Sequence, residues 1–460
     1  MASRIKTCII CNQRAASHEH VFPAALGGRR TNKGIYCGLH NQGYSPLARI
    51  LSEQLRLFNA ILGVAGDHSE HPHTVQTDDA ESGHSLVLSE DRVEFAQPHV
   101  VAKTTDGPTS NVTLRFSNPR QKEEWIKAQE ALGFKVTQGV EQPGQSYFPS
   151  ETHIPLLLGG PEGLRAIGYV ALTFMAHFFP HFARSSAIDA FKAYTLGSGG
   201  AGNVAWDWEP DGLVPNRFEF GHRVVVGFDS SSRTAYARVS LFSALHFAAV
   251  LGLSSEPASM SVVVDIDPLA EHPPNDMHVE RASSAVGSVP QSTQSSITHA
   301  DAIRGGVARQ SLMNLLQRIG KRHLLKKVAS TMLQVVDAEL LDEPAREELF
   351  ASSLARHSQT ILNLMRNVVA NLKVAHPELP EVISRLEAQV ACDPTSIDGL
   401  SDLSRAALAL ARRALTAQML EDHAHHILNQ DRLMSLLAGG PGAAVIGRVL
   451  VEPIFSSIRS

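Results

Sequence analysis

Two pairs of potential metal ligands stand close together near the start of the chain, with the same spacing in each pair. Cys8-x-x-Cys11 forms the first pair and Cys37-x-x-His40 forms the second, and the whole chain contains only one further cysteine. Two such pairs are typical of a closed, tetrahedral zinc site, in which the ion supports the local fold. We therefore predict a structural Zn²⁺ ion held by Cys8, Cys11, Cys37 and His40.

The segment between the two pairs, together with the residue that follows the second pair, carries side chains of a different chemical kind. Residues 19–28 read EHVFPAALGG, and Asn32 and Asn41 stand on either side of the second pair. Carboxylate and amide oxygens are hard ligands suited to Mg²⁺, and a nearby imidazole can deprotonate an attacking water. These residue types fit phosphodiester hydrolysis assisted by one divalent ion.

This order of residues resembles the HNH endonucleases, in particular a bacterial group with the pattern C-x-x-C … E-H-x-x-P-x-x-L-G-G … C-x-x-C-N. The match runs from Cys8 to Asn41, and His40 takes the place of the fourth cysteine. The resemblance implies a ββα-metal fold, in which two short strands and a helix surround a catalytic divalent ion. It also implies an activity, the metal-dependent cleavage of a phosphodiester backbone, with DNA as the expected substrate.

The resemblance further implies roles for individual residues. His20 is the expected general base, and Asn32 is expected to orient it. Glu19 and Asn41 are the expected ligands of a catalytic Mg²⁺ or Mn²⁺ ion. Three basic residues between the strands are expected to contact DNA phosphates without reading the base sequence: Arg29, Arg30 and Lys33.

Several alternatives stay open at this stage. His18 is a second candidate ligand in place of Glu19, although residues 18 and 20 would share one face of a strand and Glu19 would take the other. The family commonly has an acidic residue soon after the asparagine, where this chain has Gly43-Tyr-Ser-Pro46. The module could also be a catalytically inactive zinc-dependent nucleic-acid-binding or interaction protein. Finally, the helical C-terminal region could be the working part, with the nuclease as its effector.

The distribution of charge agrees with a nucleic-acid-binding N-terminus. Residues 1–60 carry eight Lys or Arg and two acids, whereas residues 61–100 carry one Arg and eight acids, so the net charge of −5 hides a basic module. A basic module on a neutral or acidic body is suited to DNA, which a uniformly acidic protein would repel.

The hydrophobic pattern divides the chain into parts and predicts an α+β protein. We expect an HNH module with structural zinc over 1–62, a mixed α+β domain over 85–281, a Ser-rich linker over 282–300 and an all-helical domain over 301–460. Residues 66–84 lack periodicity and predict a loop. Strands are expected over 222–228, 235–241 and 260–266, and helices over 47–61 and 162–179.

The remaining expectations concern histidines, compartment and partners. His177 and His181 are four residues apart, but Pro180 indicates a helix end, so core or capping roles are expected. The sequence shows no apolar stretch typical of a signal peptide or membrane span, so we expect a cytoplasmic protein without membrane contact. The helical region would permit a homo-oligomer, and nothing in the sequence requires one.

Overall fold

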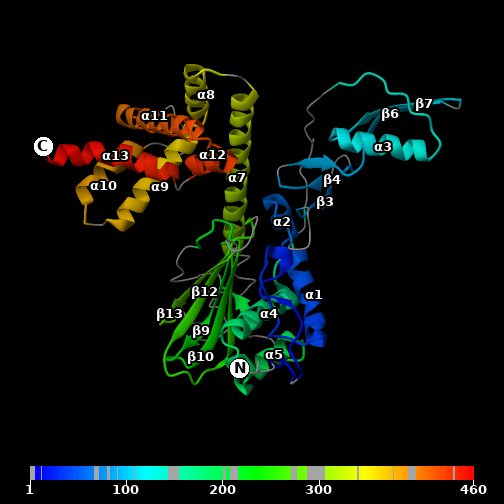
Figure 1. Cartoon of the computed structure of the whole chain (residues 1–460), viewed down its shortest axis with the longest axis vertical. Helices are drawn as coiled ribbons and strands as arrows, with labels where there is room; N and C mark the ends of the chain where they lie inside the picture. The colour runs from blue at the N-terminus through cyan, green and yellow to red at the C-terminus, as the bar shows by residue number, and fades with distance from the viewer. Residues whose placement is uncertain are drawn as a thin grey trace. The chain divides into compact units, whose positions relative to one another are not determined.

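The computed structural model is an α+β protein that divides into two compact units, Met1–Ile319 and Gly320–Ser460 (Figure 1). The structure describes residues 6–11, 13–66, 72–79, 83–90, 92–107, 109–142, 154, 156–199, 204–207, 216–270, 277–286, 306–338, 341–376, 378–391, 400–438 and 441–459. The two units have separate hydrophobic cores.

The first unit begins with two short strands and a helix. Strand β1 (Glu19–His20) pairs antiparallel with β2 (Thr31–Asn32), the 3₁₀ helix η1 (Ala24–Leu26) lies between them, and α1 (Gly38–Gln54) and α2 (Arg56–Leu62) follow. The order of elements over these residues is therefore ββα, with the two helices covering the expected helical segment 47–61.

The glycines of the EHVFPAALGG segment are required by the tight connection between β1 and β2. Gly27 has φ 83°, in the left-handed region that favours glycine. A Cβ at Gly28 would lie 2.0 Å from the carbonyl oxygen of Phe22. The ring of Phe22 is fully buried between Phe174 and His222. This part of the motif thus has a structural explanation that is independent of catalysis.

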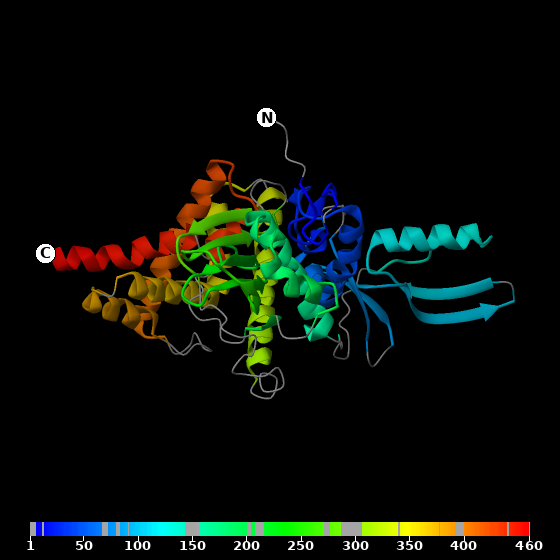
Figure 2. The same ribbon diagram turned by 90° about the horizontal axis from the view of Figure 1, so that it is seen from below.

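The prediction of a loop over 66–84 is wrong in part. Strand β3 (Val75–Asp78) lies there and pairs with β4 (Ser85–Leu88), which pairs with β5 (Val93–Phe95). Cross-strand hydrogen bonds and the burial of Val75 stabilise this strand, which is too short to show a period in the sequence. A two-stranded ribbon, β6 (His99–Asp106) and β7 (Thr109–Arg115), and helix α3 (Pro119–Ala131) follow it (Figure 2).

A six-stranded antiparallel sheet forms the centre of the first unit, in the order β13-β12-β9-β10-β11-β8. Its strands are β8 (Val204–Trp206), β9 (His222–Asp229), β10 (Thr234–Leu241), β11 (Leu245–Leu253), β12 (Met260–Ile266) and β13 (Met277–Ala282). The three predicted strands are confirmed as β9, β10 and β12. Helix α4 (Gly160–Phe178) packs against the sheet, as Figure 1 shows, and is followed by η2 (Phe182–Arg184), η3 (Ser186–Ile188) and α5 (Asp189–Thr195).

Segments 1–62 and 85–281 share one hydrophobic core. Leu26 and Leu47 from the first segment lie in the same buried cluster as Phe174 of α4 and Val224 of β9. Residues 287–300 of the predicted linker lie outside the described residues.

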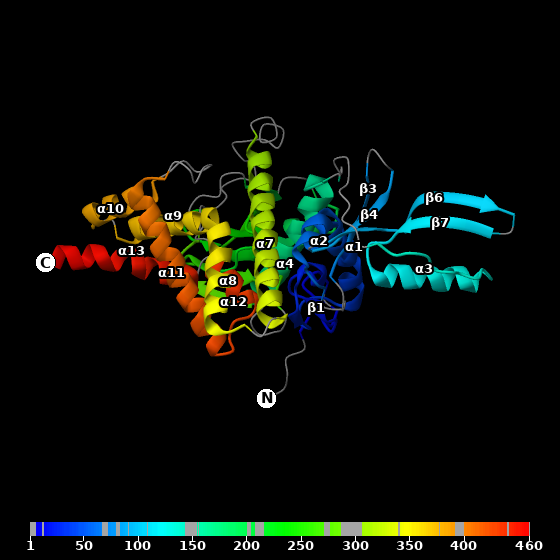
Figure 3. The same cartoon turned by 90° about the horizontal axis from the view of Figure 1, so that it is seen from above.

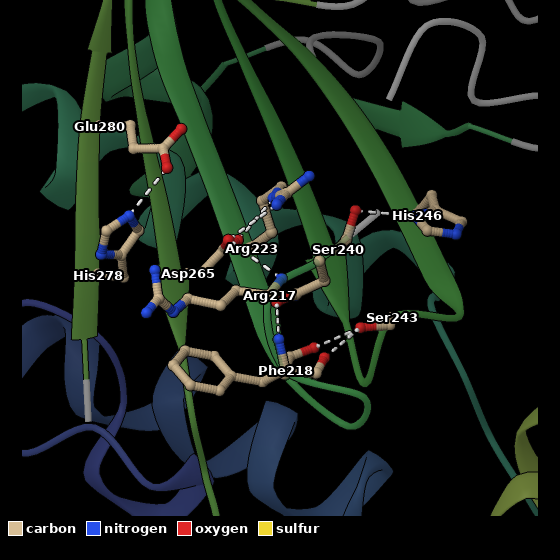
Figure 4. A network of polar contacts seen from close by, with 11 residues as sticks. Arg217, Phe218, Arg223, Ser240, Ser243, His246, Asp265, His278 and Glu280 are labelled. Atoms are coloured by element: carbon tan, nitrogen blue, oxygen red, sulfur yellow. Dashed lines mark hydrogen bonds and ion pairs between the residues drawn. The ribbon is translucent and has the colours of Figure 1, made fainter. Parts of the chain in front are cut away.

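A row of polar side chains crosses the central sheet in register (Figure 4). Arg223 forms a bidentate ion pair with Asp265, with Nε–Oδ1 and Nη2–Oδ2 distances of 2.6 and 2.8 Å. On the neighbouring strands, the Ser240 hydroxyl lies 2.7 Å from Nδ1 of His246. Both charges of the Arg223–Asp265 pair are buried, and their two hydrogen bonds compensate for that burial.

The secondary structure described in the second unit is all helical. Helix α7 (Val307–Ala338) runs into it from the first unit, and the remaining helices gather into one group (Figure 3). These helices are α8 (Glu343–Arg356), α9 (Ser358–Ala375), α10 (Pro380–Val390), α11 (Asp402–Ala424), α12 (Gln430–Ala438) and α13 (Pro441–Arg459). An ion pair between the buried Asp422 and the half-buried Arg432, with Oδ2–Nε at 2.6 Å, joins α11 to α12.

Within the described residues, one stretch, Gln430–Val451, is long and apolar enough to cross a membrane by length and composition. Leu433, Leu436 and Ile446 of this stretch are buried in the core of the second unit. The core helices of a globular domain have the same composition, so the expectation of no membrane contact stays a prediction.

His222 makes the stability of the first unit dependent on pH. The side chain is fully buried on β9, and burial lowers its pKa from 6.5 to about 3. Below about pH 6.5 the unfolded chain therefore binds a proton on His222 that the folded chain does not bind. The free energy of unfolding falls as the pH falls through this range. We expect a loss of about 2 kcal/mol between pH 7.5 and pH 5 from this group. Urea unfolding of the wild type and of His222→Asn, which cannot titrate, measures it as the difference in pH dependence, and equal pH dependence would contradict the prediction.

Candidate metal centre

The four predicted zinc ligands come together in one cluster. Their ligand atoms all lie within 4.8 Å of one another. The Sγ atoms of Cys11 and Cys37 are 3.7 Å apart, and Nδ1 of His40 lies 3.7, 3.4 and 3.2 Å from the Sγ atoms of Cys8, Cys11 and Cys37. Bond lengths to tetrahedral zinc imply ligand separations of about 3.8 Å between two sulfurs and about 3.6 Å between sulfur and nitrogen. The cluster therefore has the dimensions of a Cys₃His zinc cage, and the predicted gathering of these side chains is confirmed.

The chain pre-organises this cage through local structure. Cys37 is the N-cap residue of α1, so its sulfur lies at the positive end of the helix dipole. Burial raises the pKa of the Cys37 thiol, but hydrogen bonds from the backbone and side chain of His40 outweigh burial and lower that pKa to about 6. A thiolate is the form that binds metal, so the site favours the ligand state before any ion arrives.

Arg184 of η2 braces both loops of the cage. Its Nη2 donates to the carbonyl oxygens of Thr7 and Gly34, each at 2.7 Å, and its Nε donates to Thr7 at 3.1 Å. Thr7 precedes the first ligand and Gly34 lies shortly before the third. The segment after α4 therefore fixes the separation of the two ligand pairs.

Glu19, a predicted ligand of the catalytic ion, points into the protein. Its side chain is 7% exposed, and one carboxylate oxygen accepts a hydrogen bond from the hydroxyl of Tyr169 on α4. Burial raises the pKa of Glu19 to about 7, although the hydrogen bond from Tyr169 lowers it. The rings of Tyr44 and Tyr169 stack with centroids 5.0 Å apart beside this carboxylate.

Asn41, the second predicted ligand of that ion, is oriented by one hydrogen bond. Its Nδ2 donates to the hydroxyl of Ser17 at 2.7 Å. Its Oδ1 is buried and has no hydrogen-bond partner among the described residues. A buried amide oxygen without a donor is costly, and a cation would compensate for this cost.

His20 and Asn32 lie in the hairpin of β1 and β2, but as members of different cross-strand pairs. Glu19 lies opposite Asn32, and the half-buried His20 lies opposite Thr31. The Asn32 amide donates through Nδ2 to Nδ1 of His177 on α4, at 2.8 Å. The hydrogen bond found for the Asn32 amide nitrogen is therefore to His177.

Of the three residues predicted to contact phosphates, two are anchored within the first unit. Arg29 donates to the carbonyl oxygen of Ala270 at 2.8 Å, and Arg30 donates to that of Met277 at 3.3 Å. Lys33 is exposed. Arg30 thus attaches the hairpin to the start of β13, and Arg29 attaches it to the connection after β12, whereas Lys33 is exposed.

Sequence reasoning missed the contribution of α4 to this site. Tyr169, Thr173 and His177 are spaced four residues apart on one helix face. The Thr173 hydroxyl lies 3.0 Å from the hydroxyl of Tyr36, so the three side chains contact Glu19, Tyr36 and Asn32 in turn. Three polar side chains at helical spacing in an apolar helix mark a polar face in the sequence, but this spacing does not indicate which residues the face contacts.

Comparisons of the chain with models of protein families, with curated proteins and with solved structures found no match.

Proposed function

We propose that the chain is a metal-dependent endonuclease of the HNH type that hydrolyses phosphodiester bonds in DNA. The observation that carries the proposal is the arrangement of the N-terminal residues. A cage with zinc dimensions brackets a β-hairpin that bears Glu19 and His20, and α1 begins at the cage and bears Asn41. A zinc ion that held the ligand pairs would brace the hairpin against the helix.

The residues of the site fit a second, hard divalent ion. The orphaned Oδ1 of Asn41 and the buried carboxylate of Glu19 are the oxygens that would hold Mg²⁺ or Mn²⁺. When bound, such an ion would neutralise charge that develops on the leaving oxygen of the phosphodiester. The Tyr169 hydroxyl fixes the orientation of the Glu19 carboxylate, and Ser17 fixes that of the Asn41 amide.

His20 performs the proton transfer in this proposal. A neutral imidazole placed beside an attacking water can accept its proton. The exposed Lys33 would add a non-specific attraction to the DNA backbone.

A second candidate function is supported by one observation on Glu19. Its carboxylate is already hydrogen-bonded by Tyr169 in a buried position, as expected of a structural residue. The module would then be a zinc-dependent nucleic-acid-binding or interaction protein without catalysis. DNA binding that persists in His20→Ala, with no cleavage by the wild type, distinguishes this function from the first.

Substitution of Asn41 tests the proposed ion site. Asn41→Ala removes the unpartnered oxygen, so we expect at least about tenfold weaker Mn²⁺ binding and a matching rise in the Mn²⁺ concentration needed for cleavage. Electron paramagnetic resonance of free Mn²⁺, titrated into zinc-loaded protein, measures the affinity. Gln42→Ala is the control, since it removes an exposed amide next to Asn41 on α1 and leaves the Asn41 contacts in place. Equal Mn²⁺ affinity of the wild type and Asn41→Ala would exclude Asn41 as a ligand.

A further inference from the structure

His177 of α4 has a defined protonation state, because its partner Asn32 has a defined orientation. The amide N–H of Gly34 donates to Oδ1 of Asn32 at 2.7 Å, so the Nδ2 group of Asn32 must face His177. Since Nδ2 can only donate, Nδ1 of His177 accepts and carries no proton. The imidazole is therefore neutral, and its hydrogen is on Nε2.

The surroundings of His177 support the same assignment. Burial lowers its pKa, and the positive charges of Arg30 and Lys6 lower it further. A neutral ring thus presents an N–H donor beside two cations. The hydrogen bond found for the ring within the described part of the chain is the one at Nδ1, and the side chain is half-buried.

Positive charge gathers on this side of the hairpin. Lys6 reaches Gly34, where a Cβ would lie 2.9 Å from the lysine Nζ and 3.2 Å from Oδ1 of Asn32. Lys33 is exposed on the same turn. A neutral N–H donor flanked by ammonium and guanidinium groups is suited to an oxygen of a phosphodiester, which attracts cations and accepts hydrogen bonds.

We propose that His177 is a DNA-binding residue of the candidate nuclease site, and that its Nε2–H donates to a phosphate oxygen of the substrate backbone. The inference rests on the proposed function and adds to it a residue outside the matched N-terminal segment. Helix α4 would then serve the site twice, through Tyr169 on Glu19 and through His177 on the DNA.

Two substitutions separate this role from a structural one. Asparagine places a polar atom near the position of Nδ1, so His177→Asn keeps the contact with Asn32 and loses the Nε2 donor. Glutamine places an amide nitrogen near the position of Nε2, so His177→Gln keeps the donor and loses the contact with Asn32. A DNA-binding role predicts that Gln preserves function, and a structural role predicts that Asn preserves it.

The experiment measures binding of a fluorescently labelled DNA duplex by fluorescence anisotropy, with the full zinc-loaded chain in a His20→Ala background. We expect His177→Ala and His177→Asn to raise the Kd about tenfold, and His177→Gln to stay within about threefold of the background. Because the imidazole is neutral, these variants should keep the salt dependence of binding, whereas Lys33→Ala should lower its slope by about 0.9. His181→Ala, at an exposed histidine beyond the helix end, is the matched control.

The outcomes distinguish this inference from the proposed function. If His177→Asn binds like the background and His177→Gln does not, the residue is structural and the inference is overturned. Unchanged binding in all three His177 variants would overturn it as well, and cleavage by the wild type would still support the nuclease. If the background protein does not bind duplex DNA even at low salt, both the inference and the DNA substrate are wrong.

Discussion

Replacement of Cys37 by serine is expected to remove the zinc ion and to unfold the N-terminal part of the first unit. Cys37 supplies one ligand of the cage and also begins α1, so its loss affects both the metal and the helix. Structural zinc sites contribute about 10 to 16 kcal/mol to the folding of small metal-binding modules, far more than any single side chain in the core. The zinc content should fall from about one ion per chain to nearly none.

Elemental analysis of the purified protein measures the zinc, and differential scanning calorimetry measures the folding. Cys392→Ser is the matched control, because Cys392 is the one cysteine outside the cage. The unfolding transition of the second unit should persist in both variants, since its core contains none of the zinc ligands. Retention of one zinc per chain by Cys37→Ser would contradict the assignment of this ligand.

Replacement of His20 by alanine is expected to lower the rate of DNA cleavage by about 10² to 10⁴-fold while DNA binding is retained. A positioned general base contributes a factor of this size. The side chain is half-buried on a two-residue strand, so its removal leaves the hydrophobic core intact.

Single-turnover cleavage of a labelled duplex measures the chemical step, and anisotropy measures binding of the same duplex. His425→Ala, at an exposed histidine of the second unit, serves as the control for the loss of an imidazole. A His20→Ala variant that cleaves at the wild-type rate would show that another group is the base.

The sequence predicted that the four candidate zinc ligands lie close together, because ligand spacing is a local property. Cys8-x-x-Cys11 and Cys37-x-x-His40 each place two ligands on one turn, and the only long-range step is to join the turns. Strands β9, β10 and β12 were also predictable from local sequence, because each contains β-branched and other apolar residues typical of a buried strand. Strand β3 was missed because its stability comes from pairing with β4 and not from its own four residues.

The partners of Glu19 and Asn32 could not be predicted from the sequence. Both contacts cross from the hairpin to α4, Tyr169 to Glu19 over 150 positions and His177 to Asn32 over 145. Such contacts depend on how the helix packs in the shared core, and no local pattern encodes this packing. Pro180 led to the expectation of a core or capping role for His177, whereas the ring is half-buried and accepts a hydrogen bond from Asn32.

The most direct test of the central claim is a plasmid-cleavage assay of the wild-type protein with zinc retained. Mg²⁺ or Mn²⁺ is added in one series and removed by a chelator too weak to extract the zinc in the other, and zinc content is measured after each reaction. We predict nicked and then linear plasmid only where the divalent ion is present. Intact supercoiled, linear and single-stranded DNA after incubation with folded, zinc-loaded protein and either ion would contradict the assignment of a nuclease.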